Sequence, residues 1–151
     1  MSVNTQESIL ESLAAAMEVM AFVAVSPLDA KPHMPNGIRI LTMPFTGTSS
    51  GVLQIAAPPE FGRVLSANIF ACDPNDPQAT NGADDALKEL LNITSGLALS
   101  RLVDLLGSEP AMALPELSID GEPDAFDRFG PDSAWLDAEG HPVGIRLRLN
   151  A

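Results

Sequence analysis

The stretch that most constrains the fold runs from Asp84 to Leu106 and reads DDALKELLNITSGLALSRLVDLL. It is the longest segment of the chain that combines helical periodicity with the absence of proline. On a helix that turns by about 100° per residue, its apolar residues gather on one side, which is typical of a helix packed on a core. These residues are Leu87, Leu90, Leu91, Leu97, Ala98, Leu102 and Leu105. The fold must therefore bury one side of a long helix.

The opposite side of this helix carries Asp85, Glu89, Asn92 and Gly96, each three or four residues from the next. We call these four residues the polar stripe. A glycine inside a helix costs about 1 kcal/mol relative to alanine. Gly96 on an exposed side therefore asks for a physical reason, and close approach of a partner's backbone is one candidate.

Glu89 and Asn92 offer a carboxylate and a carboxamide side by side on rigid backbone. The carboxylate can pair with a lysine of another molecule, and the carboxamide can both donate to and accept from a water, which orients that water. Water positioning of this kind promotes hydrolysis in phosphoryl-transfer enzymes. From the spacing alone, however, an ordinary solvated helix face is the better explanation, because acids and amides belong on exposed faces.

The same residues resemble the signature helix of the CheC/CheX/FliY family of chemotaxis phosphatases. The family pattern is an acid or serine, then a glutamate four residues later, an asparagine three residues after that, and a proline further along the chain. Asp85, Glu89, Asn92 and Pro115 match it, with Pro115 one residue later than in the family pattern. The upstream segment TGTSSGVLQIAAPPEFGRVLSANIF resembles the strand, turn, strand and helix that precede the motif in CheX-like proteins.

The resemblance implies a protein phosphatase that dephosphorylates the phospho-aspartate of a CheY-like response regulator. Asn92 would orient the attacking water, and Glu89 would pair with the regulator's lysine. Asp85, Gly96 and Pro115 would contact the regulator. The bound regulator would supply Mg²⁺, so we expect no cofactor of the chain's own. The family also implies a homodimer, although the sequence offers no clear interface for one.

Two other classes of function stay open. One is a non-catalytic module that docks on a response regulator or on a flagellar switch component. The other is a structural, oligomerising domain related in fold to switch-complex proteins. The intact Glu89/Asn92 pair favours turnover over both. Thr94 and Ser100 have no histidine at helical spacing to activate them as nucleophiles.

The order of elements and the resemblance both imply an α+β fold, in which an antiparallel sheet carries the long N-terminal and motif helices on one face. The length of 151 residues fits a single domain over 1–151. The other expected elements are a helix over 7–25, strands over 38–46 and 51–57, a helix beginning at 58–60, a strand over 116–119, and a hairpin of 135–136 and 143–149.

Several local expectations follow from individual residues. Pro44 suggests an edge or a bulge in its strand. Residues 73–82 are expected to form a polar linker that ends at Asp84, a cap or first-turn acid of the motif helix. Glu18 is followed three residues later by Ala21 and not by asparagine, so we expect no second site on the N-terminal helix.

Two sets of side chains are assigned by pattern. The helix that begins at 58–60 should bury an apolar face, and the last strand should alternate between arginines outside and aliphatic residues inside. The expected buried residues are Phe61, Val64, Leu65, Ile69 and Phe70 in the helix and Ile145, Leu147 and Leu149 in the strand. Arg146 and Arg148 should be exposed. Phe126 and Phe129 should hold the acidic loop 121–131 against the body of the protein.

Composition excludes several kinds of partner. The net charge of −12 would repel a nucleic-acid backbone and would favour encounter with a basic protein surface.

The sequence has few candidate metal ligands. Its only histidines are His33 and His141, its only cysteine is Cys72, and we expect both histidines in surface loops, which argues against a metal site. An acidic start without lysine or arginine and the lack of a long apolar run indicate a cytoplasmic protein that does not enter a membrane.

Overall fold

The computed structural model describes residues 3–28, 32, 37–120, 129 and 132–150. His33 and Phe126 lie outside the described residues. The helices are α1 (Val3–Ala21), α2 (Pro59–Phe70), α3 (Pro77–Arg101) and α4 (Val103–Leu106). The strands are β1 (Val25–Leu28), β2 (Ile38–Thr46), β3 (Gly51–Ala57), β4 (Ala111–Met112), β5 (Glu116–Asp120), β6 (Ala134–Ala138) and β7 (His141–Leu149).

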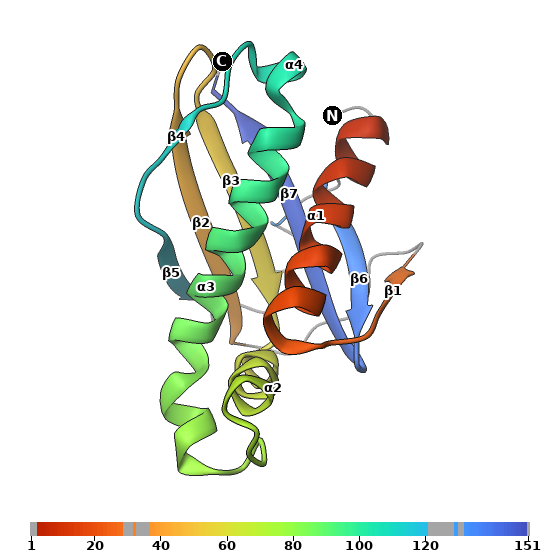
Figure 1. The fold of residues 1–151 in the computed structure, drawn as a ribbon, viewed down its shortest axis with the longest axis vertical. Helices are drawn as coiled ribbons and strands as arrows, with labels where there is room; N and C mark the ends of the chain where they lie inside the picture. Colours follow the sequence, from red (N-terminus) through yellow and green to blue (C-terminus); the bar gives the residue numbers. More distant parts are fainter. Residues whose placement is uncertain (1–2, 29–31, 33–36, 121–128, 130–131, 151) are drawn as a thin grey trace.

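An antiparallel sheet carries the helices on one face, which confirms the predicted α+β fold. The strands follow the order β1-β6-β7-β3-β2-β4, and β5 also pairs with β2. Helices α1 and α3 lie side by side across the sheet, and α2 lies next to the N-terminal half of α3 (Figure 1). No helix in the described part of the chain is long and apolar enough to cross a membrane.

The main core lies between this sheet and the helices. Alternation along the strands sends every second side chain toward α1 and α3. The most deeply buried members are Ile9, Leu13 and Met17 of α1, Leu90 and Leu91 of α3, and Leu41, Met43, Leu53 and Ile55 of the central strands. Burying a side chain of this size contributes about 1.5–3 kcal/mol. The α3 leucines therefore set the rotation of that helix and turn its opposite side toward solvent.

Helix α3 begins earlier than predicted, at Pro77. The side chain of Asp76 accepts a hydrogen bond from the backbone amide of Gln78 at 2.9 Å, and Pro77 occupies the first helical turn. An aspartate cap followed by proline is a strong helix start. The expected linker is therefore helical from Pro77, and Asp84 lies inside the helix and is not its cap.

The end of α3 also differs from the prediction. Leu102 leaves helical geometry, at φ −101° and ψ 18°, and separates α3 from the short α4. Gly107, at φ +84°, then ends α4 in the left-handed conformation. The break changes the direction in which later side chains point, so Leu105 is 51% exposed and was wrongly placed in the apolar stripe.

The N-terminal helix ends at Ala21, before the predicted boundary. Phe22 adopts a left-handed conformation at φ +54°, and its amide donates to the carbonyl of Glu18 at 3.1 Å. The chain then forms β1, which pairs antiparallel with β6. This strand was not predicted, since the helix was expected to continue to residue 25. Pro27 is tolerated here because β1 is an edge strand.

Pro44 lies at an irregularity of the sheet, in line with the predicted bulge: between the pairs Thr42–Glu116 and Phe45–Met112 the partner segment has one residue more than β2. Strand β2 pairs with β3 on one side and with β4 and β5 on the other. The pairing with β5 ends at Thr42, and the pairing with β4 begins at Phe45. Pro44 lies at this interruption, where the sheet needs no amide donor from it.

The far face of the sheet has a second apolar cluster, and it overturns the prediction for Arg146. Ile38, Ala56, Phe129 and Trp135 form this cluster. Arg146 is only 9% exposed there, with Nε donating to Gln54 at 2.7 Å. The expected outward arginine is therefore inside, because Phe129 covers that face.

The predicted burial of the other β7 residues is correct for three of them and wrong for one. Ile145 and Leu147 are buried and Arg148 is exposed, as predicted. Leu149 is exposed, contrary to the prediction.

The environment of Arg146 lowers its pKa to about 10. Burial is the largest cause, and the nearby positive charge of Arg148 acts in the same direction, whereas Asp132 raises the pKa.

Candidate functional site

Helix α3 presents the polar stripe to solvent. Asp85, Glu89 and Asn92 are exposed and Gly96 is half-buried. Leu90 and Leu91, which lie between Glu89 and Asn92 in the sequence, are fully buried in the core. Because these buried neighbours hold the helix rigidly, the stripe has a defined orientation and does not depend on a loop.

The polar side chains of the stripe are not engaged elsewhere. Within the described ranges, the side chains of Asp85, Glu89 and Asn92 take part in no hydrogen bond or ion pair. A carboxylate and a carboxamide that are free in this way can meet a lysine and a water without first breaking an internal contact. The arrangement therefore offers an acceptor for a cation beside a group that can orient a water.

Gly96 lies one helical turn beyond Asn92. A Cβ atom built on it would meet no heavy atom within 4 Å. The packing of this chain therefore does not require glycine here, and alanine would fit. The open space is available to another molecule.

Pro115 is not part of the same surface element. It is half-buried in the segment between β4 and β5. The neighbouring residue Ala113 donates its amide to the carbonyl of Pro44 at 2.9 Å, which ties this segment to β2. The structure thus brings four of the five predicted site residues onto one side of α3 and places Pro115 at the sheet.

A pocket next to the stripe was missed by the sequence analysis. It lies between α2 and α3, has a volume of about 310 Å³, and is lined by Ser66, Ile69, Phe70, Gly82, Asp85, Ala86 and Glu89. Ile69 and Phe70 were expected in the core but are 44% and 48% exposed. The last turn of α2 extends beyond the core, so its apolar residues reach the surface. We call this feature the α2–α3 pocket.

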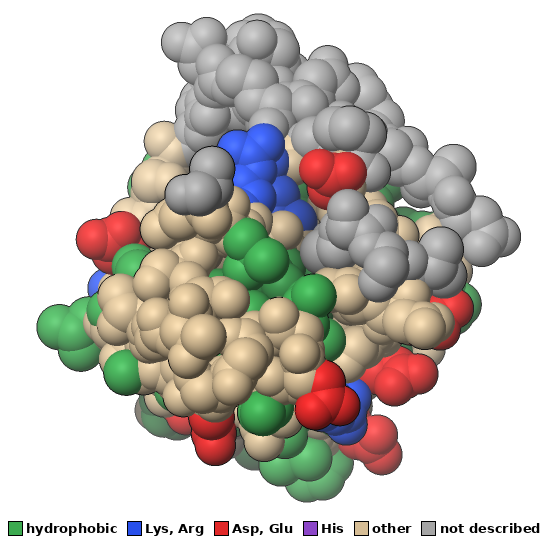
Figure 2. All heavy atoms as spheres, turned by 90° about the horizontal axis from the view of Figure 1, so that it is seen from above, with side chains coloured by type: hydrophobic (Ala, Val, Ile, Leu, Met, Phe, Trp, Pro, Cys, Tyr) green, Lys and Arg blue, Asp and Glu red, His purple; other side chains and the backbone are tan. Residues whose placement is uncertain are grey.

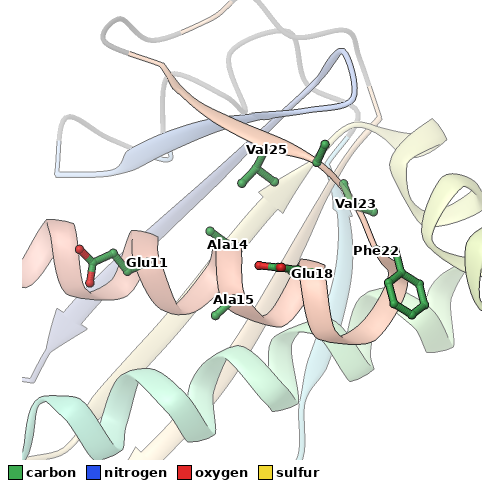
Figure 3. A pocket seen from close by; sticks show the side chains of 8 residues that line it. Glu11, Ala14, Ala15, Glu18, Phe22, Val23 and Val25 are labelled. Atoms are coloured by element: carbon green, nitrogen blue, oxygen red, sulfur yellow. The ribbon is translucent and has the colours of Figure 1, made fainter.

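A larger pocket lies along α1, on the other long helix. It has a volume of about 660 Å³ and is formed by residues of α1 and of the segment that follows it (Figure 3). Its lining residues are Glu11, Ala14, Ala15, Glu18, Phe22, Val23, Ala24 and Val25. Alanines lie three residues after both glutamates, at Ala14 and Ala21. Among the described residues, the lining thus has acids but no carboxamide to orient a water.

Candidate metal ligands do not gather in the described part of the chain, where no group of three or more His, Cys, Asp or Glu side chains could hold an ion. His141 was predicted to lie in a surface loop, but it is the first residue of β7. The centroid of its ring lies 6.0 Å from that of Phe61. Cys72 is a free, half-buried thiol.

The acidic composition is visible on the molecular surface. At the end of the molecule seen in Figure 2, acidic side chains appear at several separate places, whereas basic side chains are confined to a few. These acids, together with the net charge of −12, favour encounter with a basic partner.

Comparison with solved structures identifies the fold. CheX from Desulfovibrio desulfuricans superposes with a TM-score of 0.71 at 14% identity, covering 98% of this chain and 100% of that one. CheX from Vibrio vulnificus gives 0.69 at 18% identity, covering 98% and 97%. CheX from Borrelia burgdorferi, solved as a complex with CheY, BeF₃ and Mg²⁺, gives 0.68 at 15% identity, covering 99% and 100%.

At these identities the likeness establishes a shared fold. No curated protein matches the chain significantly by sequence. The sequence profile described as "Chemotaxis phosphatase CheX" matches residues 40–125, more than half of the chain, and this range contains the whole polar stripe and Pro115. The chain therefore belongs to the CheX family of chemotaxis phosphatases.

Proposed function

We propose that residues 1–151 act as a single phosphatase domain that hydrolyses the phospho-aspartate of a CheY-like response regulator. Two observations support the proposal. The chain belongs to the CheX family, and a CheX of the same fold from Borrelia burgdorferi has been solved in complex with CheY. The observation that carries the proposal to specific residues is the exposed, unengaged pair of Glu89 and Asn92 on rigid helix.

Asn92 enters the regulator's active site and orients a water for in-line attack on phosphorus. The new bond joins the water oxygen to phosphorus as the bond between phosphorus and the aspartyl oxygen breaks. The aspartate leaves as a carboxylate, and the phosphoryl group leaves as inorganic phosphate (H₂PO₄⁻), which carries the oxygen and both protons of the water and can release a proton to solvent. Positioning and charge stabilisation dominate such reactions, so a single oriented amide is sufficient chemistry for this chain to supply.

The other residues of the stripe hold the complex in register. Glu89 pairs with the regulator's lysine, Asp85 contacts the regulator at the periphery, and Gly96 leaves room for its backbone. Mg²⁺ and the lysine belong to the regulator. The Borrelia complex contains Mg²⁺ together with CheY, which is consistent with this division of parts. The site thus needs no nucleophile or metal ligand from this chain.

The test is the loss of acyl phosphate from a Mg²⁺-bound, phosphorylated receiver domain, with and without this protein. Asn92→Ala should abolish the acceleration and keep binding. Asn150→Ala is the matched control, because it removes an exposed carboxamide beyond the end of β7. Binding without acceleration by the wild type would favour a non-catalytic docking module, and no binding to any receiver would contradict the proposal.

Homodimerisation stays a prediction from the family resemblance. Light scattering at several protein concentrations would give the mass in solution. The proposed chemistry uses residues of one helix only, so it does not depend on a second copy.

A further inference from the structure

The α2–α3 pocket adjoins the proposed catalytic residues. Ser66, Ile69 and Phe70 of α2 form one wall, and Gly82, Asp85, Ala86 and Glu89 of α3 form the other. Asp85 and Glu89 therefore belong to both the pocket and the polar stripe. Asn92 follows Glu89 by three residues, which is about 4.5 Å along a helix. The pocket and Asn92 lie within one ordinary protein–protein footprint, about 800 Å² per partner.

The apolar residues of the α2 wall indicate what kind of group the pocket binds. Ile69 and Phe70 expose close to half of their side chains, while Phe61 and Leu65 of the same helix are fully buried. Single exposed apolar residues are common, but Ile69 and Phe70 are adjacent and line one pocket together with polar residues, and contiguous apolar surface rimmed by polar groups marks interaction sites. The volume of about 310 Å³ is at the lower limit of the roughly 300–1,000 Å³ of small-molecule sites. The size and the apolar wall fit a protruding side chain of a protein.

Gly82 keeps the pocket open. A Cβ atom on Gly82 would lie 2.5 Å from Oγ of Ser66 and 3.0 Å from Cε2 of Phe70, two residues that line the pocket. Glycine is a poor residue for a helix interior. At Gly82 it preserves both the contact of α2 with α3 and the space beside Phe70.

The two acids on the α3 wall of the pocket determine which residue should lie next to the entering side chain. Asp85 and Glu89 are exposed carboxylates without an ion-pair partner among the residues that the structure describes, in a chain with a net charge of −12. They favour an apolar side chain that has a lysine or arginine beside it. The proposed function already brings a lysine of the receiver domain to Glu89, so the same partner presents a basic group at this rim.

We propose that the α2–α3 pocket receives an apolar side chain of the phosphorylated receiver domain, one that lies next to a basic residue, and that this contact anchors the complex. The inference rests on the proposed function. An exposed ion pair contributes little to affinity, whereas a large apolar side chain that is fully desolvated often dominates it. Phe70 and Ile69 are therefore binding residues, and they set affinity more than the rate of the chemical step.

The experiment measures binding of a receiver domain loaded with Mg²⁺ and beryllofluoride, a stable mimic of its phosphorylated form, together with KM and kcat for dephosphorylation. Phe70→Ala should raise Kd and KM about tenfold, with kcat within twofold of wild type. Asn92→Ala should lower kcat and leave Kd in place. Phe22→Ala is the matched control, because Phe22 is 84% exposed beyond the end of α1 and does not line the α2–α3 pocket.

The outcomes separate the two proposals. Unchanged Kd and KM for a folded Phe70→Ala variant, with the kcat loss of Asn92→Ala intact, would overturn the pocket assignment and leave the proposed function standing. Equal losses for Phe70→Ala and Phe22→Ala would also overturn it, since the effect would not be local. If the wild type neither bound nor dephosphorylated the receiver, the proposed function would fail, and the pocket assignment would fail with it. Circular dichroism verifies that each variant is folded.

Discussion

The guanidinium carbon of Arg146 lies 4.4 Å from the centroid of the Phe129 ring, on the far face of the sheet from the helices. The same guanidinium donates to the backbone carbonyl of Phe129 and to the side chain of Gln54. Gln54 in turn donates to the hydroxyl of Thr42 at 3.0 Å. One arginine thus connects β7, β3 and β2 to the segment that contains Phe129.

This network gives the first prediction. Arg146→Met keeps the length of the side chain but leaves the acceptors on Gln54 and Phe129 without this donor. An unsatisfied buried group costs about 1–3 kcal/mol, so we expect a fall of about 2 kcal/mol in the free energy of unfolding, measured with urea. Arg148→Met removes the same charge from an exposed site and should change stability by less than about 0.5 kcal/mol. Equal effects of the two substitutions would refute a structural role for the Arg146 network.

Gly144 gives a second prediction about stability. A Cβ atom there would lie 2.5 Å from Cη2 of Trp135, whose indole covers the strand at this point. Gly144→Ala should displace the indole and lower the free energy of unfolding by about 1–3 kcal/mol. Trp135 is the only tryptophan, so its fluorescence spectrum should report the displacement directly. An unchanged spectrum together with unchanged stability would contradict the packing described.

Gly96 provides a test in which stability and function should change in opposite directions. Gly96→Ala adds a methyl group to open space and should raise the free energy of unfolding by about 1 kcal/mol, because alanine is the better helix former. If the receiver's backbone approaches Gly96, the same methyl group should raise KM for dephosphorylation at least severalfold. A stabilised variant with unchanged KM would show that Gly96 does not provide clearance for the partner.

Glu89 allows a test of the proposed lysine contact. Glu89→Gln keeps the shape of the side chain but removes the charge, so kcat/KM should fall about threefold, equivalent to about 0.7 kcal/mol, which is the size expected of an exposed ion pair. Asp104→Asn makes the same change of net charge at an exposed position of α4 and serves as control. The salt dependence of kcat/KM should also weaken in Glu89→Gln, because a charged contact is screened by salt. Equal losses in the two variants would point to net charge and not to a specific pair.

Much of the architecture could be predicted from local pattern. The strands over 38–46 and 51–57 and the helix that begins at Pro59 have the expected bounds, because alternation, turn residues and proline position act over a few residues. The exposed side of α3 also followed from its leucine spacing. The misplaced boundaries have local explanations: the cap at Asp76, the left-handed Phe22 and the break at Leu102.

The pattern failed where burial depends on segments distant in sequence. Arg146 alternates like an exposed residue, yet it is buried, and the ring of Phe129, which comes from a different segment, lies against its guanidinium. Ile69 and Phe70 continue an apolar helix face, yet the core does not extend to their end of α2. No property of the individual residues distinguishes these positions from ordinary strand arginines and helix apolar residues.

Residue order alone is enough to place Asp85, Glu89, Asn92 and Gly96 on a single side of one long helix, because helical geometry and leucine burial both act locally. What surrounds that side depends on how distant elements pack. Their packing placed the end of α2 against α3 beside Gly82, which created the α2–α3 pocket, and it left Pro115 on a separate segment at the sheet. Such arrangements depend on the packing of whole elements, which residue spacing within one element does not encode.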